Sequence, residues 1–242
     1  MLYVLCYFTE TEISKADVRE RFSQHDFRMK ERIDIPPIFD RASVLIPLFQ
    51  VDGEWRVLLT VRSKHLRSHS GLVAFPGGKQ DSVDMDDIET ALREADEEVG
   101  LDPGSVEIVS VLHPSYVRPN ILVTVVVGII PSDFKPAINE KEVHRVFSLP
   151  LRRFLQDDFT TQQFEVAGNQ VQTYFFSDEI DGNRIVTWGF TSHYCMIAAV
   201  ILFQNYEKRI YGYSDKYVTL DCLWPGISFT NYLLSNYKTA KL

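Results

Sequence analysis

The stretch from Asp86 to Leu101, DDIETALREADEEVGL, constrains the fold more than any other part of the chain. Asp86 or Asp87 can cap the N-terminus of a helix, and Gly100 is placed to end it. Apolar residues recur at helical spacing along one face, at Ile88, Ala91, Leu92, Ala95 and Val99. The stretch therefore predicts an amphipathic helix that packs against a core.

Three carboxylates gather on a different face of this predicted helix. Glu94, Glu97 and Glu98 are three and four residues apart, so they are neighbours on the helix surface. They repel one another, and Arg93 alone cannot neutralise them. A hard divalent cation with oxygen ligands would do so. A solvated acidic helix face is the alternative interpretation.

A glycine turn, Phe75-Pro76-Gly77-Gly78, precedes the helix and can bring backbone carbonyls close to a ligand. Together the turn and the helix resemble the Nudix box, G-x5-E-x7-R-E-U-x-E-E-x-G-U with U aliphatic, of enzymes that hydrolyse nucleoside diphosphates linked to another group. The second half matches at Arg93, Glu94, Ala95, Glu97, Glu98, Gly100 and Leu101. One extra residue follows Gly78, and Asp84 stands where the first Glu is expected, which leaves its role open.

A second signature lies just upstream. Residues 58–78, LLTVRSKHLRSHSGLVAFPGG, resemble the pattern LLTxTSx3Rx3Gx3FPGG of the coenzyme A diphosphatase branch of the family. Arg62 departs from it, standing where the pattern has Thr. The resemblance and the local positive charge, which suits phosphate groups, together indicate substrate-binding residues at Arg62, Ser63, Arg67, Gly71, Phe75 and Lys79. Solubilising charges at a strand end are the alternative for the basic ones.

The resemblance implies hydrolysis of coenzyme A or acyl-coenzyme A to 3′,5′-ADP and 4′-phosphopantetheine or its acyl form, with Mg²⁺ or Mn²⁺. The implied metal ligands are Glu94, Glu97, Glu98 and the carbonyl of Gly78, with Arg93 orienting the carboxylates. The general base stays open between Glu97, Glu140 and Glu142. Two rival functions are hydrolysis of another substrate, such as ADP-ribose, and a noncatalytic binding module that would be expected to lose box carboxylates.

The order of predicted elements favours an α/β (α+β) fold with a mixed sheet, compatible with the Nudix α/β/α sandwich. A helix is expected at 14–24, then strands at 42–49 and 55–61 joined at Asp52-Gly53, and further strands at 106–112, 122–130 and 143–148. A short helix at 151–156, a hairpin at 164–176 and a helix at 190–206 follow. We expect an N-terminal helical arm at 1–35, the Nudix domain at 36–206 and a C-terminal extension at 207–242.

Composition and charge exclude several classes of partner. The net charge of −8 argues against nucleic acid, which needs a basic surface. The apolar run 194–203 has only ten residues, which predicts a buried helix and no membrane span. The three cysteines are far apart and indicate a reducing compartment.

The final residues Ala240, Lys241 and Leu242 resemble the Ser-Lys-Leu address, so we expect recognition by the peroxisomal import receptor and a peroxisomal location.

Overall fold

The main sheet of the protein is mixed, as the sequence predicts. The computed structural model describes residues 12–29, 38–66, 68–117, 120–166 and 169–204. Five strands follow the order β3-β2-β1-β6-β5, β4 pairs with β1, and β7 pairs with β2. The strands are β1 (Asp40–Val51), β2 (Glu54–Arg62), β3 (Val73–Ala74), β4 (Gly77–Lys79), β5 (Glu107–Val117), β6 (Ile121–Ile129) and β7 (Val143–Pro150). β1 runs parallel to β6, and the other described pairs are antiparallel.

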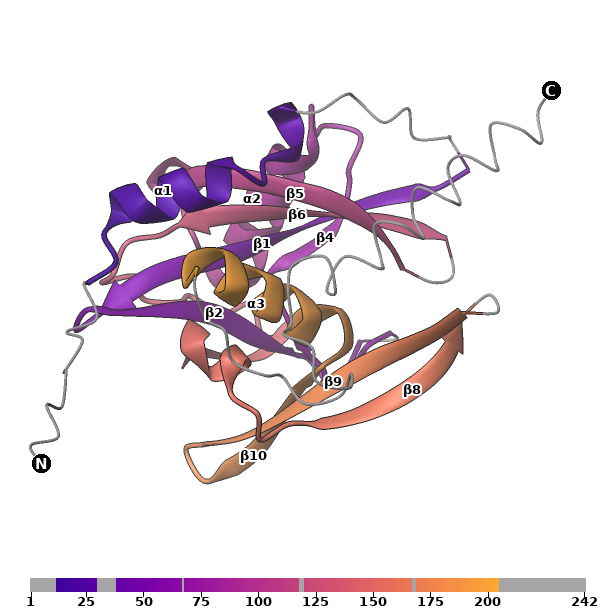
Figure 1. Cartoon of the computed structure of the whole chain (residues 1–242). Coiled ribbons are helices and arrows are strands. Elements are labelled where there is room, and N and C mark those ends of the chain that lie inside the picture. Colours follow the sequence, from indigo (N-terminus) through magenta and orange to yellow (C-terminus); the bar gives the residue numbers. More distant parts are fainter. Residues whose placement is uncertain (1–11, 30–37, 67, 118–119, 167–168, 205–242) are drawn as a thin grey trace, which may run out of the picture.

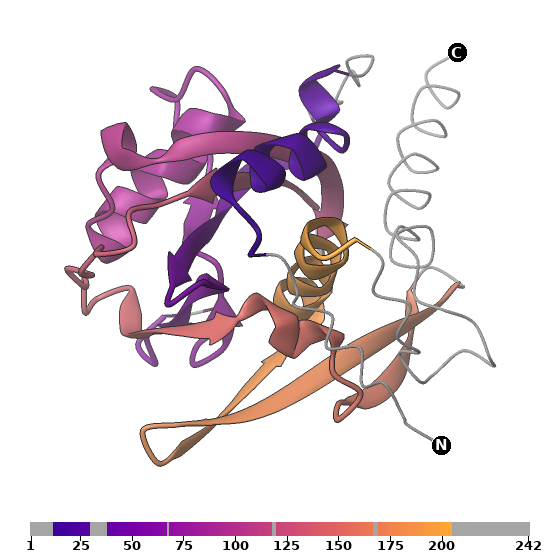
Figure 2. The ribbon, with the colours of Figure 1, turned by 60° about the vertical axis from the view of Figure 1, so that its left-hand side comes forward.

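Helices cover both faces of this sheet (Figure 1). The helix α2 (Asp87–Val99) lies on one face, and α1 (Lys15–Ser23) and α3 (Gly189–Leu202) lie on the other. Figure 2 shows the two helical layers from a second direction. This arrangement confirms the predicted α/β/α sandwich.

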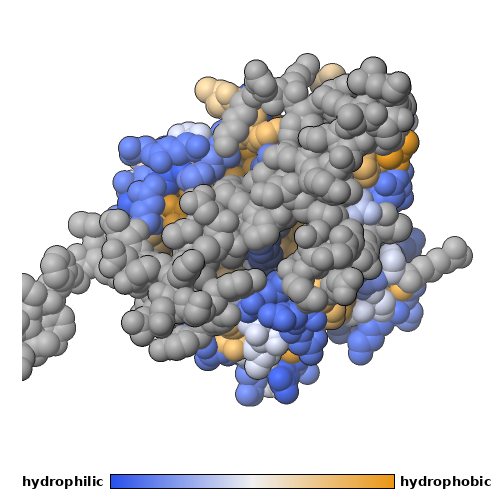
Figure 3. All heavy atoms as spheres, turned by 45° about the vertical axis from the view of Figure 1, so that its right-hand side comes forward, coloured by the Kyte–Doolittle hydropathy of each residue, from blue (hydrophilic) through white to orange (hydrophobic). Residues whose placement is uncertain are grey.

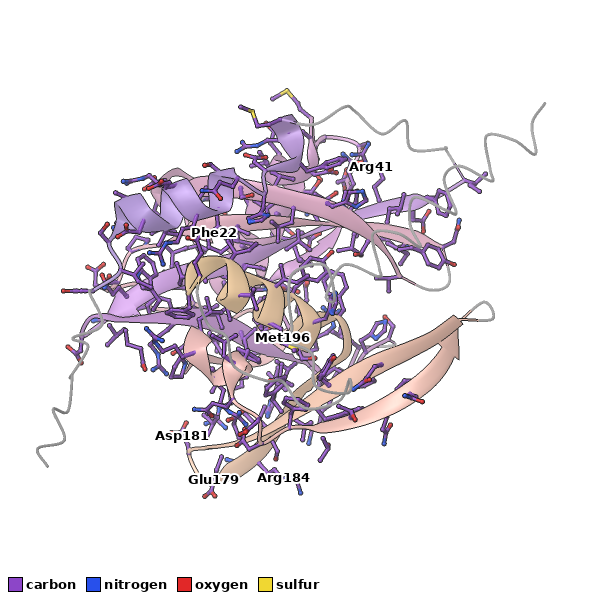
Figure 4. The ribbon with its side chains drawn as sticks, viewed as in Figure 1. Phe22, Arg41, Glu179, Asp181, Arg184 and Met196 are labelled. Carbon is purple, nitrogen blue, oxygen red and sulfur yellow. The ribbon has the colours of Figure 1, made fainter. Side chains whose placement is uncertain are left out.

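The alternation of side chains along β1 explains the two layers. Leu45 points to one face and packs in a cluster with Ala91 and Ala95 of α2. Its neighbour Ile46 points to the other face and belongs to the cluster that contains Phe22 of α1 and Met196 of α3. Figure 4 labels Phe22 and Met196, and both side chains are fully buried. Successive residues of a strand face opposite ways, so one central strand supports both cores.

Local signals placed several elements correctly. Asp52 and Gly53 both have positive φ angles, of 50° and 80°, and join β1 to β2 as the Asp-Gly signal predicts. Ser14 caps α1 in a capping box with Asp17. The strands β3 and β4 were not predicted, because two or three residues are too short to show a period. The predicted helix at 151–156 is the 3₁₀ helix η3 (Leu151–Leu155), and two further 3₁₀ turns are η1 (Phe27–Met29) and η2 (Pro103–Ser105).

A second, three-stranded sheet follows the first and has the order β10-β9-β8. Its strands are β8 (Thr160–Val166), β9 (Asn169–Ile180) and β10 (Asn183–Trp188). The hairpin of β8 and β9 was predicted, whereas β10 was missed. The signal was present, because Asp181 and Gly182 have positive φ angles of 47° and 72° and form a two-residue turn. Figure 4 shows this turn, labelled at Asp181, at the outer tip of the sheet.

The second sheet is held to the rest of the domain by buried and charged contacts. Tyr174 and Phe176 of β9 are buried in the same core cluster as α3. Arg153 of η3 donates from Nε to Asp178 at 2.5 Å, and Arg145 of β7 pairs with Asp181. The described part of the face in Figure 3 is mostly hydrophilic, with small separate hydrophobic patches. None of the described helices is long and apolar enough to cross a membrane.

Candidate active site

The acidic helix α2 begins and ends where the sequence predicts. The side chain of Asp86 accepts hydrogen bonds from the backbone N–H groups of Ile88 and Glu89, each at 2.9 Å. Gly100 ends the helix with a left-handed φ of 69°, which a side chain would disfavour. Two fixed ends set the rotation and length of the helix, and therefore the position of its carboxylates.

The loop between β6 and β7 docks on the last turn of α2. The N–H of Ala137 donates to the carbonyl of Val99 at 2.8 Å, and the N–H of Asn139 donates to the carbonyl of Glu98 at 3.0 Å. These bonds satisfy helix carbonyls that lack intrahelical donors. They also fix the loop that leads to Glu142 and β7.

Three carboxylates meet at this junction. Oxygen atoms of Glu94, Glu98 and Glu142 all lie within 4.8 Å of one another. Glu142 is held from two sides: its carbonyl accepts from the N–H of Ser63 at 2.8 Å, and its Oε1 accepts from Nδ2 of Asn139 at 3.2 Å. A helix, a strand end and a loop therefore converge on one acidic cluster.

The electrostatics of the cluster fit a bound cation. Glu98 is only 2% exposed, and burial raises its pKa to about 7, although the N–H of Gly77 at 3.2 Å and Arg62 at 3.6 Å act in the opposite direction. Burial also raises the pKa of Glu94. Raised carboxyl pKa values show that the protein leaves negative charge here only partly compensated. Oxygen ligands at this separation suit a hard divalent ion.

Asp84 has a clear structural role that the sequence left open. Its two oxygens accept from Nε and Nη2 of Arg93 at 2.8 and 2.9 Å, and these hydrogen bonds hold the pKa of Asp84 well below its usual range. Arg93 also donates from Nη2 to the carbonyl of Lys79 at 3.0 Å and from Nη1 to Glu94 Oε1 at 3.0 Å. Asp84 thus fixes the guanidinium that in turn holds Glu94.

The two glycines of the turn are needed for different reasons. A Cβ on Gly77 would lie 2.4 Å from the carbonyl oxygen of Ser43 and 2.6 Å from the Cα of Val44, which are backbone atoms. A Cβ on Gly78 would lie 2.4 Å from Glu94 Oε2, the end of a movable side chain. The first clash requires the sheet to shift, whereas the second requires only a carboxylate to move.

We therefore expect Gly77→Ala and Gly78→Ala to differ in kind. Gly77→Ala should lower the free energy of unfolding by about 1–3 kcal/mol, because the strand pair cannot accept the extra atom. Gly78→Ala should melt close to the wild type but bind Mn²⁺ about tenfold more weakly, because Glu94 is displaced. Thermal melts and calorimetric Mn²⁺ titrations of both variants make the comparison. Equal metal affinity for Gly78→Ala and the wild type would contradict it.

Comparison with known proteins agrees with this geometry. The family model described as the NUDIX domain matches residues 40–183. The chain belongs to the Nudix family. Mouse peroxisomal coenzyme A diphosphatase NUDT7 is 39% identical over 169 residues, which cover 69% of this chain and 72% of that protein. Nudix hydrolase 22, chloroplastic, of Arabidopsis thaliana is 40% identical over 169 residues, which cover 68% of this chain.

A bacterial relative, the uncharacterized Nudix hydrolase NudL of Escherichia fergusonii, is 49% identical over 115 residues, 48% of this chain. The chain spans 56% of the length of the Arabidopsis hydrolase and 59% of the length of the bacterial one. The similarity therefore covers the Nudix domain and leaves other parts of these relatives unmatched.

Four other residues expected at the Nudix site have surroundings of their own outside the carboxylate cluster of the described residues, and their roles stay predictions. Phe75 is 2% exposed in the hydrophobic core, so its side chain offers no surface to a substrate. Gly71 has a φ of 71° and closes the turn between β2 and β3, donating from its N–H to the carbonyl of Arg62 at 3.1 Å. Lys79 is exposed and pairs with Asp40 at 2.8 Å.

Glu97 is the fourth. Its side chain is 53% exposed and pairs with Arg93 at 3.4 Å, outside the carboxylate cluster of the described residues. Glu142, expected as a candidate base, occupies the third corner instead, and Glu140 is exposed. The expected positions of Glu94, Glu98, Arg93 and Gly78 around the cluster agree with the structure, while their chemical roles remain predictions.

Two substrate-binding predictions remain near the cluster, and one falls outside the described residues. Arg62 faces Glu98, and Ser63 is 2% exposed with its N–H bound to Glu142. Arg67 lies outside the described part of the chain. The sequence analysis did not predict the pairing of Asp84 with Arg93. The available signal was an acidic residue in the turn before the helix together with an arginine on the helix.

Proposed function

We propose that the protein hydrolyses the pyrophosphate bond of coenzyme A and acyl-coenzyme A, releasing 3′,5′-ADP and 4′-phosphopantetheine or its acyl form. The observation that carries the hydrolase part is the convergence of Glu94, Glu98 and Glu142 from two elements on one cation-sized site. The coenzyme A part is supported by the upstream signature in residues 58–78 and by the similarity to the mouse enzyme of that name.

The residues present fit a divalent ion, because three carboxylate oxygens lie close enough to share one and burial raises the pKa of Glu94 and Glu98. Bound Mg²⁺ or Mn²⁺ would supply positive charge against the pyrophosphate and lower the pKa of a coordinated water. Glu94 and Glu98 would hold it, and Glu142 lies beside them in the same cluster. Arg93, fixed by Asp84, would keep Glu94 in position.

The general base is proposed from placement. Glu142 lies inside the cluster and is oriented by Asn139, so its carboxylate can accept a proton from a water near the other two carboxylates. Glu97 lies at the exposed edge and reaches the cluster only through Arg93. We therefore place Glu142 ahead of Glu97 for this role, and Glu140 behind both.

Product analysis tests the proposed function. The purified protein is incubated with coenzyme A in the presence of Mg²⁺, of Mn²⁺, or of a chelator, and nucleotides are separated by chromatography. We expect 3′,5′-ADP only when the metal is present. ADP-ribose and a dinucleoside polyphosphate serve as competing substrates. Faster hydrolysis of either would assign the site to that substrate, and no hydrolysis of any would favour a binding module.

We also propose a peroxisomal location, with the import receptor as a partner. The proposal is supported by Ala240-Lys241-Leu242 and by the printed name of the mouse relative, while Arabidopsis relatives are named chloroplastic and mitochondrial. The tripeptide lies outside the described residues.

A fluorescent protein fused to the N-terminus, with Leu242 left free, should give peroxisomal puncta. Deletion of residues 240–242 should make the signal diffuse. A chloroplast or mitochondrial pattern, or puncta that persist after the deletion, would contradict the role of the tripeptide.

A further inference from the structure

The strand β2 ends in an irregularity that directs one cation at the acidic cluster. The pairing of β2 with β7 shifts register between Val61 and Arg62. Such shifts re-aim side chains and are common beside active sites. At this one, Nη1 of Arg62 lies 3.6 Å from Oε1 of Glu98, the most buried carboxylate of the cluster.

Two arginines partly neutralise the negative charge of the cluster, Arg93 at Glu94 and Arg62 at Glu98. Arg93 is fully engaged with Asp84, Glu94 and the carbonyl of Lys79. Arg62 instead faces Glu98, at a distance that gives Coulomb attraction without a close hydrogen bond. Its Nε is a buried donor that has no acceptor among the described residues. A buried donor without an acceptor is costly, so a ligand that supplied an acceptor to Nε would be favoured.

We propose that Arg62 is the internal counter-cation of the acidic cluster, which competes with the divalent ion for Glu98 and, once displaced, binds a phosphate oxygen of the substrate. The inference rests on the proposed function for its second half only. Its first half concerns the charge of the site alone: three carboxylates and Arg62 sum to less negative charge than the three carboxylates by themselves. Affinity for a divalent ion rises with the negative charge of its ligand set.

Arg62 is also a point where this sequence differs from the branch pattern, which has Thr there. A chain with Thr at this position would bind the divalent ion more tightly in the absence of substrate. It would also have one fewer positively charged side chain to bind the phosphates. Arg62→Thr and Arg62→Gln are therefore informative replacements, and Arg62→Lys retains the charge.

Calorimetric titration with Mn²⁺, without substrate, tests the first half. We expect Arg62→Gln and Arg62→Thr to bind Mn²⁺ about tenfold more tightly than the wild type, because a competing positive charge 3.6 Å from Glu98 is gone. Arg62→Lys should bind close to the wild type. In a chelator, Arg62→Gln should melt at a lower temperature than the wild type, since Glu98 has lost its partner.

Arg41→Gln is the matched control. Arg41, on β1, pairs with Asp87 of α2 at 2.8 Å, outside the carboxylate cluster, so its loss removes one positive charge that faces the same helix, and the Mn²⁺ affinity should stay unchanged. Unchanged or weaker Mn²⁺ binding by the neutral Arg62 variants would overturn the counter-cation role.

Kinetics at saturating Mn²⁺ test the second half. We expect the KM of Arg62→Gln for the pyrophosphate substrate to rise about tenfold with a smaller change in kcat, because a ground-state contact with phosphate is lost. An unchanged KM would overturn the phosphate contact. Failure of the proposed function is separate, since it would show as absence of hydrolysis by the wild type while the Mn²⁺ titrations still report on Arg62.

Discussion

Glu98→Gln is expected to lower turnover of the pyrophosphate substrate by ~10²-fold or more with the fold intact, because the reaction depends on charge placed at the phosphate. The substitution keeps the size of the side chain and removes one charge from the cluster of Glu94, Glu98 and Glu142. Single-turnover rates at saturating Mn²⁺ measure the effect. Asp96→Asn is the matched control, because Asp96 is an exposed acid on the same helix. A rate for Glu98→Gln close to that of Asp96→Asn would remove Glu98 from the metal site.

Glu98→Gln should also be more stable than the wild type at high pH in the absence of metal. Burial raises the folded-state pKa of Glu98 from 4.5 to about 7, so in a chelator the wild type loses stability as the pH rises from about 4.5 through 7. At pH 8 the neutral Gln avoids a cost of roughly 3 kcal/mol, and at about pH 4, where Glu98 is largely protonated in both the folded and the unfolded state, the two proteins should be alike. Denaturant melts at both pH values measure it. Lost activity with gained stability would mark Glu98 as a functional group held at a cost to the fold.

Asp84→Asn is expected to lower the free energy of unfolding by about 3 kcal/mol at pH 7 and to reduce turnover. Asp84 is buried, and its removal leaves Arg93 without its bidentate partner and Glu94 without a fixed neighbour. The pKa of Asp84 is lowered in the folded state, so the stabilisation is fully present above the ordinary carboxyl range and is lost progressively as the pH falls from that range toward the lowered pKa.

In denaturant melts from pH 7 to pH 3, the difference between Asp84→Asn and the wild type should therefore narrow toward the acid end. The change in stability with pH separates this ion pair from a simple packing defect, which would give a difference independent of pH. Asp81→Asn is a suitable comparison, because Asp81 is an exposed acid in the same turn whose side chain accepts hydrogen bonds from Ser82 and Val83. A loss in Asp81→Asn equal to that in Asp84→Asn would assign the effect to the turn and not to Arg93.

The sequence by itself determined the local elements of the fold. Asp86 and Gly100 set the ends of α2, and Asp52-Gly53 set the first hairpin, because caps and tight turns depend on residues only a few positions apart. The alternating and helical patterns also gave the mixed sheet between helices. The strands β3 and β4 were too short to show a period. The strand β10 was not predicted, although Asp181-Gly182 indicates the turn before it.

The composition of the site was decided only by the tertiary structure. Spacing on α2 made Glu97 a candidate ligand beside Glu94 and Glu98, but the packing of the helix buries Glu98 and leaves Glu97 exposed. Glu142 enters because the carbonyls at the end of α2 bind the N–H groups of a distant loop. The sequence therefore determined that a carboxylate-rich helix would form, and the docking of that loop and helix on the sheet decided which carboxylates meet.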